Sequence, residues 1–284
     1  MHQQIITFYQ VCDTYLHHKG FADDPQARMT TVEVLTTALV AAWIFANNLR
    51  LARQAMAESG LVGYMLSESQ FNRRWHKIGL DDWQAILSQL EKEPSEDTFV
   101  VDSCPLPVCH NQRAKRCRLY QDPAGAYWGY CAAKEQYYYG LKAHVIVTAS
   151  GRPVEVLLLC GCSADLTGLK EMALNLPQGC RLYADKAYTD YDYETDLKQD
   201  KQILLLPIRK SNAKRCHAKE VAEALGRGRK RIETTFSQIS AKLPRCIHAV
   251  VAAGFESKVL ALFVAFAIWC VHNQKKADAW RVAS

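Results

Sequence analysis

The sequence lacks several features that would place it in a specialised class of protein. No uninterrupted apolar run reaches the roughly 18 to 20 residues of a membrane span, and the longest, Val259–Val271, predicts a buried helix. No basic segment followed by an apolar core opens the chain, so we expect a cytoplasmic protein with no membrane partner. Internal repeats and low-complexity tracts are absent. With 49% hydrophobic and 23% charged residues, the composition excludes general disorder and collagen-like sequence.

The eleven cysteines form no recognisable framework. Their number is odd and no export signal accompanies them, so reduced thiols are expected. Two close pairs, Cys104 with Cys109 and Cys160 with Cys162, lack the spacing and the second ligand pair of a structural zinc site. Buried thiols are favoured over zinc, and the sequence assigns the cysteines no role.

Positive charge is concentrated in the second part of the chain. The net charge of +6 divides into −2 for residues 1–94 and +8 for residues 95–284. Two tracts carry most of the excess, one around Arg113–Arg118 and one from Pro207 to Arg231. Such density attracts polyanions through phosphate contacts, whereas either tract alone is also typical of a solvated surface.

Residues 1–94 have the pattern of an all-α domain. Thr31–Asn47 is apolar and free of glycine and proline, which predicts a buried helix, and Ser67–Gln70 has the form of a capping box. In the helix that follows, apolar and basic residues occupy different faces: Phe71, Trp75 and Ile78 against Arg73, Arg74 and Lys77. This is the pattern of a helix-turn-helix recognition helix and equally of an amphipathic helix in a small bundle.

Strand patterns begin after a linker at Glu91–Asp97. Five runs are β-branched, aromatic or apolar with alternating character: Thr98–Val101, Tyr137–Val147, Pro153–Leu159, Arg181–Ala184 and Ile203–Leu206. Helical spacing separates the later ones and continues through Ile232, Phe236, Ile239 and Leu243. A mixed five-stranded sheet with helices on both faces is the natural arrangement. The tyrosine-rich stretch Tyr127–Tyr139 favours strand packing over stacking on an unpaired base.

Three acidic residues stand out by position. Asp102 and Asp185 each follow a strand, and Glu233 lies on a helix. Parallel neighbouring strands would bring the two aspartates to one edge of the sheet. Clustered carboxylates repel one another unless cations lie among them, and carboxylate oxygen suits Mg²⁺. Two such ions about 3.5–4 Å apart promote in-line attack on a phosphodiester.

Arg229 lies four residues before Glu233, on the same helix face. Its guanidinium is placed either to grip a DNA phosphate or to form a simple ion pair with Glu233. Asp165 has two similar interpretations, as the N-cap of a short helix or as a supporting acid.

Four segments together resemble the successive motifs of bacterial insertion-sequence transposases. They are Phe99–Ser103, Tyr139–His144, Asp185–Tyr188 and Arg229–Ser237, within residues 97 to 245 and in the order of that family. The resemblance implies an RNase H-like catalytic domain of the DDE type at 95–245. An all-α domain at 1–94 would precede it, and a C-terminal helical segment at 246–284 would pack on it.

The resemblance also implies roles for single residues. Asp102, Asp185 and Glu233 would be the catalytic and metal-binding acids, with Asp165 as a supporting candidate. The cofactor would be two Mg²⁺ ions, with Mn²⁺ as a substitute. Two departures from the family pattern concern phosphate contacts: Gly226 stands where some relatives have tyrosine, and Ser240 where lysine is expected.

The expected function is therefore DNA transposition: cleavage at the ends of an insertion sequence, then transfer of the freed 3′-hydroxyls into target DNA. The partners would be terminal inverted repeats, target DNA and a second copy of the chain, on the bacterial nucleoid. The residues expected to contact DNA are Arg113, Lys115, Arg116, Lys142, His144, Arg209, Lys210, Arg229, Lys230 and Arg231. The alternatives are a non-catalytic DNA-binding protein derived from a transposase and a structure-specific nuclease on the same fold.

Overall fold

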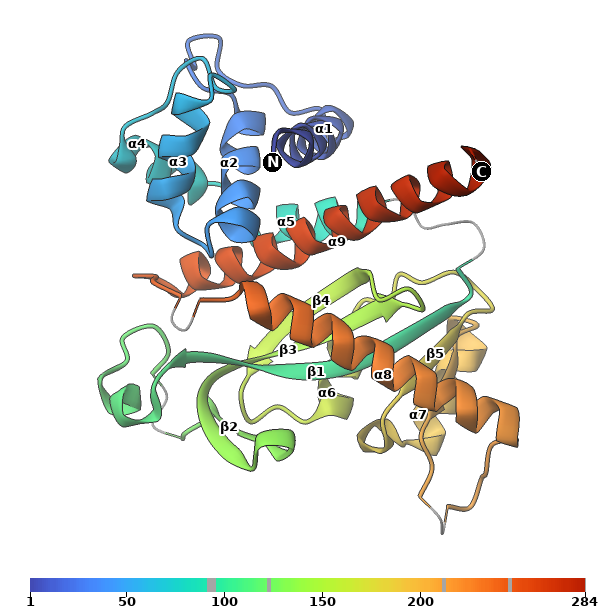
Figure 1. Cartoon of the computed structure of the whole chain (residues 1–284). Helices are drawn as coiled ribbons and strands as arrows, with labels where there is room; N and C mark the ends of the chain where they lie inside the picture. The colour runs from blue at the N-terminus through green and yellow to red at the C-terminus, as the bar shows by residue number, and fades with distance from the viewer. Residues whose placement is uncertain (91–95, 122–123, 211–212, 245–246, 284) are drawn as a thin grey trace. The chain divides into compact units, whose positions relative to one another are not determined.

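The structure is a computed structural model that describes residues 1–90, 96–121, 124–210, 213–244 and 247–283 (Figure 1). The chain divides into two units, here called the helical unit (Met1–Glu91 with Ile239–Ser284) and the sheet unit (Lys92–Gln238). The sequence analysis predicted a domain boundary near residue 94 and a separate C-terminal segment, 246–284, packed on the catalytic domain. In the structure this segment groups instead with the N-terminal helices.

Six helices make up the described part of the helical unit: α1 (His2–His18), α2 (Thr31–Ile44), α3 (Leu49–Glu58), α4 (Glu68–Trp75), α5 (Leu80–Gln89) and α9 (Ala252–Ala283). Local signals fix several of their starts. Thr30 and Ser67 each form a capping box with the residue three positions later, which satisfies donors that a helix start leaves free. Helix α2 is buried along nearly its whole length, as its apolar sequence predicts.

Helix α9 packs against α1, α2 and α5. Its aromatic residues Phe266 and Trp269 contact Trp43 of α2, with ring centroids 6.0 and 5.5 Å apart. The segment Ala252–Gln274 is long and apolar enough to cross a membrane, yet 72% of its most apolar window is buried within the structure. Burial of this extent is what a core helix shows. The expectation that this segment packs on the catalytic domain stays a prediction.

The described part of the sheet unit contains six strands: β1 (Thr98–Cys109), β2 (Trp128–Cys131), β3 (Gln136–Thr148), β4 (Pro153–Cys160), β5 (Arg181–Ala184) and β6 (Leu204–Pro207). β1 pairs parallel with β5 and β5 with β6, whereas β3 pairs antiparallel with β1, β2 and β4. The predicted mixed sheet is thus present, but the predicted number of five strands was wrong. β2 was missed because Gly129 interrupts its pattern of strand-forming residues; the contacts of Gly129 with Tyr138 and Gly161 leave no room for a side chain.

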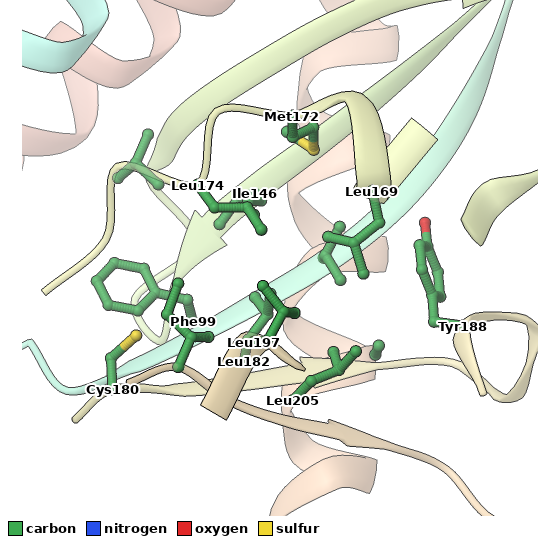
Figure 2. Packing of buried hydrophobic residues seen from close by; sticks show 14 residues of the cluster. Phe99, Ile146, Leu169, Met172, Leu174, Cys180, Leu182, Tyr188, Leu197 and Leu205 are labelled. Atoms are coloured by element: carbon green, nitrogen blue, oxygen red, sulfur yellow. The ribbon is translucent and has the colours of Figure 1, made fainter. Parts of the chain in front are cut away.

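Helices cover both faces of this sheet (Figure 1). On one face, α6 (Asp165–Glu171) and α7 (Tyr191–Asp200) enclose a core that includes Phe99 and Val101 of β1 (Figure 2). On the other face lies α8 (Lys219–Lys242), where Gly228 approaches Val100 and Tyr183. A Cβ at Gly228 would lie 3.1 Å from both side chains. Glycine at this position therefore lets α8 pack closely on the sheet.

Candidate active site

Strand register brings Asp102 and Asp185 together. β1 and β5 are parallel, and their last paired residues are Val101 and Ala184. Asp102 and Asp185 are the next residues on each strand, so their positions follow from backbone pairing alone. Ligands of α/β sheets commonly bind at this carboxyl edge. The prediction that neighbouring parallel strands bring the two aspartates together is confirmed. The prediction that Asp102 ends its strand is wrong, because β1 continues to Cys109 in pairing with β3.

Asp102 is a largely buried acid. Its Oδ1 accepts a hydrogen bond of 2.8 Å from the backbone N–H of Ser103. Burial raises the pKa of Asp102 to about 6, since the backbone hydrogen bond and Arg229 only partly offset burial and the negative charges of Asp165 and Asp185. The positive charge near Asp102 is therefore too small to compensate for the burial of its carboxylate. Perturbed carboxyl groups of this kind gather at functional sites.

Asp185 is held by the backbone and faces a cation. Its Oδ1 accepts a hydrogen bond of 2.7 Å from the N–H of Lys186, at the start of the 3-10 turn Lys186–Tyr188. The same oxygen lies 3.8 Å from Nη1 of Arg229. The buried Tyr188 ends this turn, and the pKa of its phenol is raised well above the usual value, first by burial and then by Asp102, Asp165 and Asp185. Its ring therefore closes one side of the acidic site.

Glu233 reaches the site through Arg229. Nε of Arg229 donates a hydrogen bond of 3.0 Å to Oε1 of Glu233, one helical turn away. The pKa of Arg229 is raised by this bond and by the negative charge of Asp185. Both side chains are about half exposed. The ion pair that the sequence allowed is thus present, and the guanidinium links Glu233 to Asp185.

A small hollow of about 10 Å³ marks the centre of the site. Three polar side chains line it, those of Asp102, Asp185 and Arg229, and the other lining residues are Val100, Val101, Tyr183, Ala184, Leu225 and Ile232. Glu233 is not among them. Over the residues that the structure describes, no group of three His, Cys, Asp or Glu side chains is arranged to hold a metal ion.

The side-chain oxygens of the site can be compared with the ligands that a divalent cation prefers. Asp102 and Asp185 offer the hard carboxylate oxygens that Mg²⁺ binds, and the raised pKa of Asp102 indicates a shortage of positive charge. These two residues fit the ion. Glu233 offers the same type of oxygen, but in the structure its carboxylate is bonded to Arg229.

Asp165 and Ser103 extend the acidic site on the opposite face of β1. Oγ of Ser103 donates a 2.6 Å hydrogen bond to Oδ1 of Asp165, and Nζ of Lys142 lies 3.5 Å from the same oxygen. The N-cap of α6 is Ala164, so the capping role allowed for Asp165 is wrong. Ser103 was missed by sequence reasoning, although its position directly after Asp102 was a signal.

Two residues expected to contact DNA are engaged inside the protein. His144 is fully buried, and its ring packs so closely on Gly168 that a Cβ added at Gly168 would lie 2.2 Å from Nδ1 of His144. Burial lowers the pKa of His144 to about 4. Arg209 forms two hydrogen bonds to Glu194, of 2.8 and 2.5 Å, with side chains that are 8% and 9% exposed. Neither side chain faces solvent, so these two expectations are corrected. Lys142 is also largely enclosed, donating to the carbonyl of Ser163.

The other basic residues remain accessible. The exposed ones are Arg113, Lys115 and Arg116 in the 3-10 turn Asn111–Arg116, Lys210 after β6, and Lys230 and Arg231 on α8. Arg231 makes one long contact of 3.4 Å to the carbonyl of Ala149. These side chains are available to a polyanion.

In the helical unit, α4 buries Phe71 and Trp75 as its spacing predicts. Arg74 is tied to Asp23, with Nη2 2.6 Å from Oδ1, whereas Arg73 and Lys77 are exposed. All three basic residues line a cavity of about 780 Å³. Arg74 thus has a structural role, whereas Arg73 and Lys77 are exposed. Both interpretations of this helix, as a recognition helix and as a helix of a small bundle, therefore remain open.

Comparison with known proteins adds evidence on the family of the chain. A family model described as "Transposase DDE domain" matches residues 93–270. The chain belongs to this family. Comparisons with curated proteins and with solved structures gave no match. The resemblance to insertion-sequence transposases is thus confirmed, and the mixed sheet with helices on both sides fits the RNase H-like fold of a DDE transposase. The match continues past residue 245 into α9.

Proposed function

We propose that the protein is a DDE transposase that cleaves DNA at the ends of an insertion sequence and joins the freed 3′-hydroxyls to target DNA. The observation that carries this proposal is the paired placement of Asp102 and Asp185 beyond Val101 and Ala184, with Arg229 beside them. Family membership supports transposase function and DNA as the partner. The proposal adds the residues, the reaction steps and the geometry of binding.

In this proposal Asp102, Asp185 and Glu233 hold two Mg²⁺ ions, or Mn²⁺ in their place. Such ions supply activation of the attacking oxygen and stabilisation of the leaving oxygen. The chain's own residues position the DNA. Arg229 releases Glu233 and turns its guanidinium to a phosphate, for which its planar fork is suited. The aspartates need no rearrangement, because the backbone N–H groups of Ser103 and Lys186 already orient them.

The surrounding surface would hold the DNA backbone. Arg113, Lys115 and Arg116 on one turn, and Lys210, Lys230 and Arg231 near α8, are exposed cations with the charge that phosphates require. The helical unit would recognise terminal inverted repeats, with Arg73 and Lys77 as its free basic residues. Bringing two ends together calls for two copies of the chain, working on the bacterial nucleoid in the cytoplasm.

The test uses the full chain, duplex DNA carrying the inverted repeats that flank its gene, and Mg²⁺. Asp102→Asn should retain DNA binding in a gel-shift assay and lose cleavage by at least a hundredfold, as expected when a metal-binding acid is removed. The matched control is Asp97→Asn, which changes an exposed aspartate before β1 and should cut at the wild-type rate. Cleavage by Asp102→Asn at the rate of the control would remove Asp102 from the mechanism.

Two further outcomes separate the alternatives. A structure-specific nuclease would cut branched DNA without repeats as fast as repeat DNA and would form no strand-transfer product. A non-catalytic DNA-binding protein would bind the repeats in the wild-type form and cut nothing with Mg²⁺ or Mn²⁺.

A further inference from the structure

Two cysteines meet at the end of the β3–β4 hairpin. Cys160 is the last residue of β4 and pairs with Leu141, and Cys162 follows after a single glycine. Their sulfur atoms lie 3.6 Å apart, and the hydroxyl oxygen of Ser163 lies 3.0 Å from the Cys160 sulfur. Cys162 is exposed and Cys160 half-buried. The pair is therefore accessible from solvent.

The backbone holds this arrangement in place. The N–H of Ser163 donates to the carbonyl of Cys160 at 3.0 Å, closing a turn, while the N–H groups of Gly161 and Cys162 donate to the carbonyls of Gly140 and Ala126. A Cβ at Gly161 would lie 2.7 Å from the carbonyl oxygen of Tyr127. The backbone of the segment is thus held from both sides, and the two sulfur atoms lie close together.

We propose that Cys160 and Cys162 form a thiol–disulfide exchange site that is oxidised by low-molecular-weight disulfides such as oxidised glutathione. Closing the bond requires the sulfur atoms to approach from 3.6 Å to about 2 Å, a change within reach of side-chain rotation in a turn.

The chemistry is a two-step exchange. One cysteine gives its proton to water and, as a thiolate, attacks a sulfur of the small disulfide, whose S–S bond breaks to release one thiolate. The second cysteine loses its proton and attacks the protein sulfur of this mixed disulfide, releasing the second small thiolate. The two thiolates take up the two protons, so one protein disulfide is formed and one small disulfide is reduced to two thiols.

Both thiols are free in the structure. Burial and the neighbouring Cys160 sulfur raise the pKa of the Cys162 thiol. Because the thiolate is the nucleophile, the raised pKa slows attack by Cys162 at neutral pH, and the exchange calls for the small disulfide in excess.

The experiment treats the reduced, folded full-length protein with oxidised glutathione, blocks remaining thiols by alkylation and analyses tryptic peptides by mass spectrometry. Trypsin does not cut between Arg152 and Pro153, so residues 143–170 form one tryptic peptide, which contains these two cysteines and no other. We expect most of this peptide to lose two hydrogen atoms, to resist alkylation and to recover both thiols with dithiothreitol. Glutathione adducts on both cysteines, or two thiols still open to alkylation while Cys216 has reacted, would overturn the proposal.

Variants distinguish the pair from a general reactivity of exposed thiols. Cys216→Ser removes another exposed cysteine and should leave the oxidation of the peptide 143–170 unchanged. Cys162→Ser should stop at a mixed disulfide on Cys160, and Cys160→Ser at one on Cys162. If one of these variants fails to fold, the other still tests the proposal. A disulfide joining either cysteine to a different one, in wild type or variant, also contradicts the proposal.

Discussion

Replacing Asp102 with asparagine is expected to stabilise the fold at neutral pH although it removes the proposed activity. Burial raises the pKa of this carboxyl from 3.8 to about 6. Below pH 3.8 the acid is neutral in both the folded and the unfolded chain and costs nothing. As the pH rises towards 6 the unfolded chain ionises first, so the folded state loses stability across this window and gains none back above it.

The magnitude follows from the size of the shift. A difference of about two pKa units corresponds to about 3 kcal/mol at pH 7.5, at roughly 1.4 kcal/mol per unit. Asparagine carries no charge to desolvate, keeps an oxygen that can accept the N–H of Ser103, and offers its NH₂ group to the neighbouring carboxylates. We therefore expect Asp102→Asn to unfold with a free energy higher by up to about 3 kcal/mol at pH 7.5, and by about half as much at pH 5.

The assay is urea unfolding of wild type and variant, without divalent cations, at pH 7.5 and pH 5. Asp97→Asn is the control, because Asp97 is 64% exposed and its ion pair with Arg181 spans 3.7 Å, which predicts a change below about 1 kcal/mol. A variant less stable than wild type at pH 7.5, or a gain that is the same at both pH values, would refute the burial argument.

Three further predictions concern an ion pair, a close contact and a helix cap, and the same unfolding measurement checks each of them. Arg209→Ala leaves the carboxylate of Glu194 buried without its partner and should cost about 3–5 kcal/mol; a loss below 1 kcal/mol would show that water reaches this pair. Gly168→Ala places a methyl group against the His144 ring and should cost about 1–3 kcal/mol, with the loss reduced when His144 is also shortened to alanine. Thr30→Ala removes the N-cap of α2 and should cost about 0.5–2 kcal/mol, whereas Thr30→Ser should be nearly neutral.

Backbone features of the sheet unit were readable from the sequence. The alternation across residues 137–147 and the turn at Gly151 predicted the β3–β4 hairpin, and Gly151 indeed has a positive φ of 92°. The acids after two short strands predicted the pairing of Asp102 with Asp185. Both inferences rest on period-2 patterning and strand ends, which local sequence determines.

Side-chain partners were not readable in this way. Nothing near His144 in the sequence indicates that α6 will pack over its ring, and Glu194, the partner of Arg209, lies 15 residues away on another element. Glu233 shared a helix face with Arg229, but sequence alone gave no choice between a metal and the guanidinium. Such outcomes depend on tertiary packing, and so does the grouping of α9 with the N-terminal helices.

The parallel register of β1 and β5 has one further consequence. The spacing of the two aspartates is set by main-chain hydrogen bonds between Val101 and Ala184 and their neighbours, not by the connections that lead away from them. Segments on either side, including the basic loop between β6 and α8, can change in length or composition without moving this pair. Changes in the loops that alter the charge of the surface are thereby separated from the position of these two acids.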